Sequence, residues 1–137
     1  MLRVTADTNI WISAFNYGGN PRKLIDLADA GKIDLATSDA IIEETRRILG
    51  KRFGWPPEDI ADAEAEMRRL ARHVIPHVTL DAVKDDPSDN RIVECAVSAG
   101  SDYLVTGDKD LLRLGQYDSV RIVNVADFLG IATQRQR

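Results

Sequence analysis

Short apolar runs that alternate with helical patterns are the feature that most limits the folds open to this chain. Such runs occupy residues 2–6, 33–36, 103–106 and 120–125, and the first is typical of a strand buried on both faces. Strand after helix after strand indicates parallel pairing with right-handed crossovers. We therefore predict an α/β fold, in which helices flank a central parallel β-sheet on both faces.

Capping residues, prolines and glycines place the helices between these strands. Predicted helices cover residues 20–31, 38–49, 57–71, 89–100 and 108–114, with a helix or loop over 10–15 and a closing helical turn over 126–129. Asn20, Ser38 and Asp89 are the predicted N-caps, because Asn, Ser and Asp accept hydrogen bonds from the free amides of a first turn. Residues 74–80 are predicted to be mostly extended.

Length and composition fit one domain, which we place at residues 1–130 with a frayed tail at 131–137. The single cysteine, Cys95, cannot form an internal disulfide, which is typical of a reducing compartment. The N-terminus lacks the pattern of a secretion signal, and no apolar run approaches the ~20 residues that span a bilayer. We expect a cytoplasmic protein that does not contact membranes.

The charge balance bears on the partners of this domain. With 18 basic and 22 acidic residues, its net charge of -4 argues against a protein that binds nucleic acid over its whole surface. If four of the acids are gathered in one metal site, however, the remaining surface is close to neutral. Such a protein can still bind a polyanion.

Several carboxylates follow the predicted strands, where ligands collect in parallel α/β sheets. Asp7 directly follows the first strand, and Asp108 follows the strand at 103–106 by one glycine. A carboxylate that ends a buried strand is costly unless something binds it. Asp108 and Asp110 have the simpler alternative of starting a helix, whose dipole favours early acids, and Asp89 that of being an N-cap.

Glu44 differs from these acids because it lies beside the apolar stripe of the predicted helix at 38–49. Its neighbour Glu43 is better explained as a solvated ion-pair partner of Arg46 or Arg47. Four carboxylates that reach one site repel each other unless a cation joins them, and oxygen ligands favour Mg²⁺ or Mn²⁺. Zinc is disfavoured, because the chain offers it one cysteine and two histidines separated by a proline.

Four motifs in this order resemble those of PIN-domain ribonucleases, and of their VapC-like group of toxins in toxin–antitoxin systems. The motifs are Val4-Thr5-Ala6-Asp7-Thr8-Asn9, Ser38-x-x-Ile41-Ile42-x-Glu44-x-x-x-Ile48-Leu49, Asp86-Pro87-x-Asp89-Asn90 and Val105-Thr106-Gly107-Asp108-Lys109-Asp110-Leu111-Leu112. The resemblance spans nearly the whole chain, from Leu2 to about Leu129. It implies a single PIN-like domain that hydrolyses RNA phosphodiester bonds.

The resemblance also implies roles for individual residues. The acids that would hold one or two Mg²⁺ or Mn²⁺ ions are Asp7, Glu44, Asp89 and Asp108, with Asp110 assisting. Asn9 and Thr106 would orient these carboxylates or bound water. A cognate antitoxin and a homodimer are the partners that it implies besides RNA.

RNA must be bound by residues outside the acidic site. The candidate basic residues are Arg46, Arg47, Lys51, Arg52 and Lys109, each of which has the alternative of a solvated surface position. Among the aromatic residues, Trp55 in a Gly-Pro loop is the best candidate for a contact surface, whereas core packing is expected for Trp11 and Phe15.

Two other functions are compatible with parts of this pattern. One is a catalytically weak or inactive PIN-like domain that binds RNA or a partner. The other is a haloacid-dehalogenase-like phosphatase, which also places an aspartate after its first strand. That chemistry requires a second acid two residues later, where this chain has Asn9.

Overall fold

One six-stranded sheet forms the centre of the molecule in the computed structural model, which describes residues 1–83 and 86–135. The strands are β1 (Leu2–Ala6), β2 (Ile33–Thr37), β3 (Arg72–His73), β4 (Tyr103–Val105), β5 (Gln116–Tyr117) and β6 (Val120–Val123). Their order is β3-β2-β1-β4-β6-β5, so β1 lies inside the sheet and pairs with β2 and β4 in parallel. The predicted α/β class and the four predicted strands are confirmed.

The two strands that we did not predict are the outermost ones. β3 pairs with β2 in parallel, whereas β5 pairs with β6 in the antiparallel direction, so the sheet is not parallel throughout. Each has two residues and is exposed or only half-buried. An edge strand this short has no apolar run or alternation that a sequence could display.

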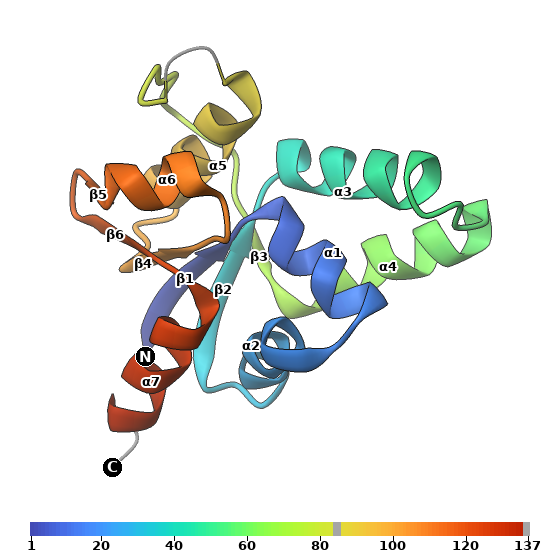
Figure 1. Ribbon diagram of the computed structural model, residues 1–137, viewed down its shortest axis with the longest axis horizontal. Helices are drawn as coiled ribbons and strands as arrows, with labels where there is room; N and C mark the ends of the chain where they lie inside the picture. The colour runs from blue at the N-terminus through green and yellow to red at the C-terminus, as the bar shows by residue number, and fades with distance from the viewer. Residues whose placement is uncertain (84–85, 136–137) are drawn as a thin grey trace.

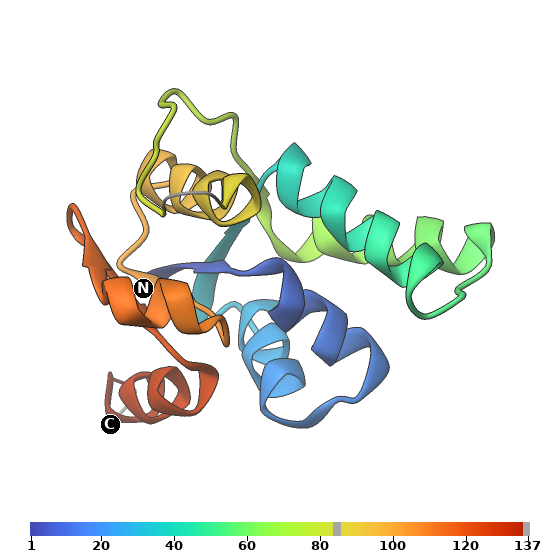
Figure 2. The same ribbon diagram turned by 45° about the horizontal axis from the view of Figure 1, so that its top comes forward.

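Helices cover both faces of the sheet, as predicted. They are α1 (Thr8–Asn16), α2 (Gly19–Asp29), α3 (Asp39–Lys51), α4 (Pro57–Leu70), α5 (Pro87–Ser98), α6 (Lys109–Leu114) and α7 (Val125–Arg135). α5 lies on one face of the sheet and α2 and α7 on the other, while α3 and α4 pack on each other and project to one side (Figures 1 and 2). Within the described residues, no helix is long and apolar enough to cross a membrane.

Side chains from both helical layers bury the central part of the sheet. Fully buried side chains include Val4, Leu35 and Leu104 from the strands and Trp11, Leu24, Ile25, Ile41, Ile42, Met67, Leu111 and Phe128 from the helices. The helical stripes at Leu24–Ile25 and Ile41–Ile42 therefore face the core as their spacing predicts. Trp11 is a core residue, also as expected.

Three predicted helix boundaries are wrong. The second helix begins at Gly19, after Gly18 at φ +76°, so Asn20 is not its N-cap. The cap of α5 is Asp86, whose carboxylate accepts from the Asp89 amide at 3.1 Å, so Asp89 is the third residue of the helix. Finally, the closing helical turn predicted at residues 126–129 is helix α7, which continues to residue 135; residues 136–137 lie outside the described residues.

The backbone of the segment before α5, at residues 77, 80 and 83, is hydrogen-bonded to side chains of that helix. Both amide atoms of the Asn90 side chain bond to the backbone of Val83, at 2.8 and 2.9 Å. One turn further, the buried Glu94 carboxylate accepts from the backbone amide of Leu80, and one turn beyond that Ser98 accepts from that of residue 77. This ladder fixes the extended segment against α5, whose first turn carries Asp89.

Candidate active site

Asp7 lies directly after β1 and is 4% exposed. Its backbone amide donates to the carbonyl of Val105 in β4 at 2.9 Å, which continues the β1–β4 pairing. The hydroxyl of Thr106 donates to Asp7 Oδ2 at 2.6 Å and accepts from the Asp108 amide at 2.9 Å. Thr106 thus joins the two acids that follow adjacent strands.

The electrostatics of Asp7 identify its acidic neighbours. Burial raises the pKa of Asp7, and the negative charges of Glu44 and Asp108 raise it further. Hydrogen bonds from the Thr106 hydroxyl and the Asn9 backbone amide oppose this rise because they favour the carboxylate. The side chain of Asn9 is exposed, so it is the backbone of this residue that contacts Asp7.

Asp89 reaches the same place from the first turn of α5. It is 8% exposed, and its Oδ2 is fully buried without a hydrogen-bond partner among the described residues. The pKa of Asp89 is raised to about 8, chiefly by burial. A hydrogen bond between protonated Asp89 and Asp108 contributes to this rise, and so do the negative charges of Asp108, Asp86 and Asp7. A buried carboxylate oxygen without a partner is costly.

Asp86 is an acid of this cluster that the sequence analysis did not place in the site. Carboxylate oxygens of Asp86, Asp89 and Asp110 lie within 4.8 Å of one another. The available signal was the Asp-Pro pair that begins α5, since an N-cap carboxylate lies next to the first helical turn. Asp110 is more exposed than the others, and its carboxylate pairs with Arg113 at 3.0 Å.

The register of α3 separates its two glutamates as predicted. Glu44 is half-buried, and its charge acts on the pKa of Asp7. The side chain of Glu43 is 71% exposed and pairs with Arg46 at 3.4 Å. Glu44 is therefore an electrostatic neighbour of Asp7 at the end of β1.

The candidate RNA-binding residues are not equivalent in the structure. Arg46 pairs with Glu64 as well as Glu43, at 3.2 Å, whereas Arg47 lines a hollow of about 540 Å³ beside Glu44. Lys109 is exposed and directly follows Asp108. The remaining two, Lys51 and Arg52, are exposed at the end of α3 that points away from the sheet (Figure 1).

This arrangement fits a hard divalent cation. The ligands on offer are carboxylates, which Mg²⁺ and Mn²⁺ prefer, and the unpartnered Oδ2 of Asp89 is an atom that a cation would satisfy. The charges of Glu44 and Asp108 act on the pKa of Asp7, and those of Asp108, Asp86 and Asp7 act on that of Asp89, while the carboxylates that lie within 4.8 Å of one another are those of Asp86, Asp89 and Asp110.

The fold and the site together define a class of protein: α/β domains that carry an acidic cluster at the carboxyl edge of the sheet. The chain belongs to the PIN domain family, whose sequence pattern matches residues 3–110 and so includes every acid of the cluster. The predicted resemblance is confirmed, and the phosphatase alternative is without support.

Comparison with solved structures finds a similar fold in VapC20 of Mycobacterium tuberculosis, described as a sarcin–ricin loop cleaving toxin. The two chains are 21% identical and superpose with a TM-score of 0.60, over 86% of this chain and 98% of that one. No curated protein sequence matches the chain.

Proposed function

We propose that this protein is a Mg²⁺- or Mn²⁺-dependent ribonuclease, and that it acts as the toxin of a toxin–antitoxin pair. The observation that carries the proposal is the buried, unpartnered Oδ2 of Asp89 in a cluster that also contains Asp7, Glu44 and Asp108. Membership in the PIN domain family and the fold shared with VapC20 support it.

Asp7, Glu44, Asp89 and Asp108 would hold one or two ions, with Asp110 and Asp86 at the edge of the site. A bound ion would supply a hydroxide at neutral pH and neutralise charge on the phosphate. Thr106 orients the Asp7 carboxylate by its 2.6 Å hydrogen bond, and the Asn9 backbone amide keeps the same group charged. These contacts favour the ionised form that a cation needs.

RNA would be held beside the acids rather than along the whole surface. Arg47 lines the same hollow as Glu44, and Lys109 directly follows Asp108; Arg47 has no acidic partner within 4.0 Å among the described residues. The positive charge of Arg46 is already paired with the carboxylates of Glu43 and Glu64. We therefore assign phosphate contacts to Arg47 and Lys109 before the other basic residues.

The test is cleavage of RNA by the purified protein. We expect cleavage of single-stranded RNA, assayed alongside a sarcin–ricin loop hairpin, with Mg²⁺ or Mn²⁺ and none in EDTA. Asp7→Asn should remove the activity, because the amide lacks the charge that holds the ion. Glu44→Gln should reduce it strongly and its exposed neighbour variant Glu43→Gln little. Full cleavage in EDTA or by Asp7→Asn contradicts the proposal, and activity lost equally in both glutamate variants contradicts the choice of Glu44.

The proposed partners besides RNA are an antitoxin and a second copy of the chain, in the cytoplasm. Light scattering checks the homodimer, because a monomer has a mass of 15.2 kDa. A mass of one chain at micromolar concentration contradicts it. A small neighbouring gene that encodes a DNA-binding protein would support the toxin assignment.

A further inference from the structure

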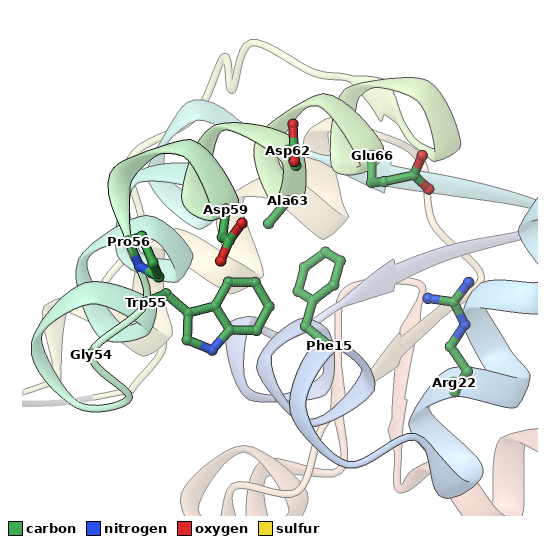
Figure 3. Close-up of a pocket in the computed structure, with 9 residues that line it drawn as sticks. All are labelled: Phe15, Arg22, Gly54, Trp55, Pro56, Asp59, Asp62, Ala63 and Glu66. Carbon is green, nitrogen blue, oxygen red and sulfur yellow. The ribbon is translucent and has the colours of Figure 1, made fainter.

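A hollow of about 500 Å³ lies away from the acidic cluster, between the last turn of α1, the α3–α4 connection and α4 (Figure 3). Phe15 and Trp55 form its apolar side. Asp59 and Ala63 of α4 extend toward these rings from the other side, whereas the Asp62 carboxylate is directed away from them, and Glu66 and Arg22 lie at one end. Its size is typical of a pocket that takes one ligand group.

The aromatic side of this hollow is held in place. The indole Nε1 of Trp55 donates to Asn16 Oδ1 at 3.1 Å, and the Asn16 amide donates to the carbonyl of Ile12 at 2.9 Å. The rings of Trp55 and Phe15 meet edge-on at 6.2 Å, and Phe15 stacks on the buried Trp11 at 6.1 Å. The exposed aromatic surface is therefore continuous with the core and already ordered.

The face of α4 opposite these rings is acidic. Asp59, Asp62 and Glu66 follow each other at helical spacing around Ala63, where a helix that packs on a neighbour normally carries apolar residues. Asp59 extends toward the Trp55 indole, and Glu66 extends toward Arg22 (Figure 3).

These carboxylates differ in how far they are already neutralised. Glu66 pairs with Arg69 at 2.9 Å, which lowers its pKa. Neither Asp59 nor Asp62 takes part in an ion pair among the described residues. The free negative charge is thus at the end of the hollow where Trp55 lies.

The chemistry of the hollow selects its ligand. The carboxylates of the hollow repel an RNA phosphate. They also do not converge on one point as metal ligands must; among the described residues, Asp86, Asp89 and Asp110 are the only three acids that do. A cation with an apolar stem satisfies both sides at once.

We propose that this hollow binds an arginine side chain of a partner protein, with its stem on Phe15 and Trp55 and its guanidinium at Asp59. Arginine fits better than lysine, because its planar guanidinium stacks on aromatic faces and meets carboxylates with two hydrogen bonds. The proposal is independent of the ribonuclease assignment, since it uses no residue of the acidic cluster.

The test is an NMR titration of the full chain with the blocked peptide acetyl-Leu-Arg-Leu-amide. The two tryptophans give separate indole N–H signals, and we expect the Trp55 signal to move while that of the buried Trp11 stays. Acetyl-Leu-citrulline-Leu-amide is the matched control peptide, because citrulline keeps the shape of arginine without its charge. We expect it to bind at least tenfold more weakly.

Protein variants test the acidic side. Asp59→Asn should weaken binding of the arginine peptide at least severalfold. Glu58→Gln changes an exposed acid of the same helix that does not line the hollow, and should leave binding unchanged. Equal binding of the citrulline peptide, an unmoved Trp55 signal at millimolar peptide, or unchanged binding by the Asp59→Asn variant overturns the proposal.

Light scattering during the titration separates a partner protein from a second copy of the chain. A constant mass as peptide is added supports a partner. Dissociation of a dimer by the arginine peptide overturns the proposed occupant, because the pocket would then already hold another copy.

Discussion

Replacing Asp89 by Asn removes one negative charge from the acidic cluster at almost constant size. The pKa of Asp89 rises from 3.8 in an unfolded chain to about 8, chiefly through burial, so the folded protein holds this proton more tightly than the unfolded chain. In the absence of metal, the wild type therefore loses stability as pH rises through that interval. The variant has no such proton, so we expect it to match the wild type at acidic pH and exceed it at alkaline pH.

The size of this difference follows from the same pKa. One pKa unit corresponds to about 1.4 kcal/mol, so the rise to about 8 sets a ceiling of roughly 6 kcal/mol on the gain in unfolding free energy above that pH. We expect a gain of at least about 1 kcal/mol, or about 3–5 °C in Tm for a domain of this size. Added Mg²⁺ counteracts this difference, because a ligand at a hundred times its Kd adds about 2.7 kcal/mol to the protein that binds it.

The assay is thermal melting of both proteins in EDTA and in Mg²⁺, at about pH 4 and about pH 9. Asp59→Asn is the matched control: like Asp89 it is the third residue of a helix that begins with proline, but it is exposed. It should lose only the helix-dipole interaction, about 0.3–1 kcal/mol, and keep the wild-type response to Mg²⁺. A less stable Asp89→Asn protein in EDTA at alkaline pH, or equal Mg²⁺ shifts in it and the wild type, would refute the reasoning.

Three further substitutions test other contacts. Thr106→Val removes the hydroxyl that donates to Asp7, so calorimetry should show weaker Mg²⁺ binding and urea unfolding a loss of about 1–3 kcal/mol; unchanged Mg²⁺ affinity would contradict this role. Asn90→Ala removes both hydrogen bonds to Val83 and should cost about 1–3 kcal/mol, with faster hydrogen exchange of the Val83 amide as the local readout. Arg47→Ala should raise the KM for RNA severalfold and Arg46→Ala much less, because Glu43 and Glu64 already pair with Arg46; equal KM values would count against the assignment.

The parts of the fold that the sequence predicted are those with a periodic apolar pattern. The central strands are buried on both faces, and α3 has an apolar stripe and a serine cap, so local pattern and tertiary packing agree there. The edge strands β3 and β5 could not be predicted in this way, because each has only two residues, which are exposed or half-buried and show no apolar pattern. Their pairing is decided by the strands beside them rather than by their own residues.

The errors at helix starts have a similar cause. Before α5, Asp86 and Asp89 are both acceptable caps, and only the backbone turn decides between them. Before α2, a glycine in the left-handed region starts the helix earlier than the Asn-Pro pair suggested. The same ambiguity hid Asp86 from the predicted site, because a capping carboxylate and one that faces a ligand look identical in sequence.

The strand order also controls when the site can exist during synthesis. Asp7 stands at the end of β1, but its hydrogen-bond partner Thr106 and its neighbour Asp108 follow β4, about a hundred residues later in the chain. A nascent chain that has exposed β1, β2 and α3 therefore still lacks one wall of the acidic cluster. Because β4 must pair beside β1, the cluster closes only after the segment that carries β4 and Asp108 has been synthesised. A chain that would cut RNA therefore lacks a complete acidic site until β4 has left the ribosome and paired with β1.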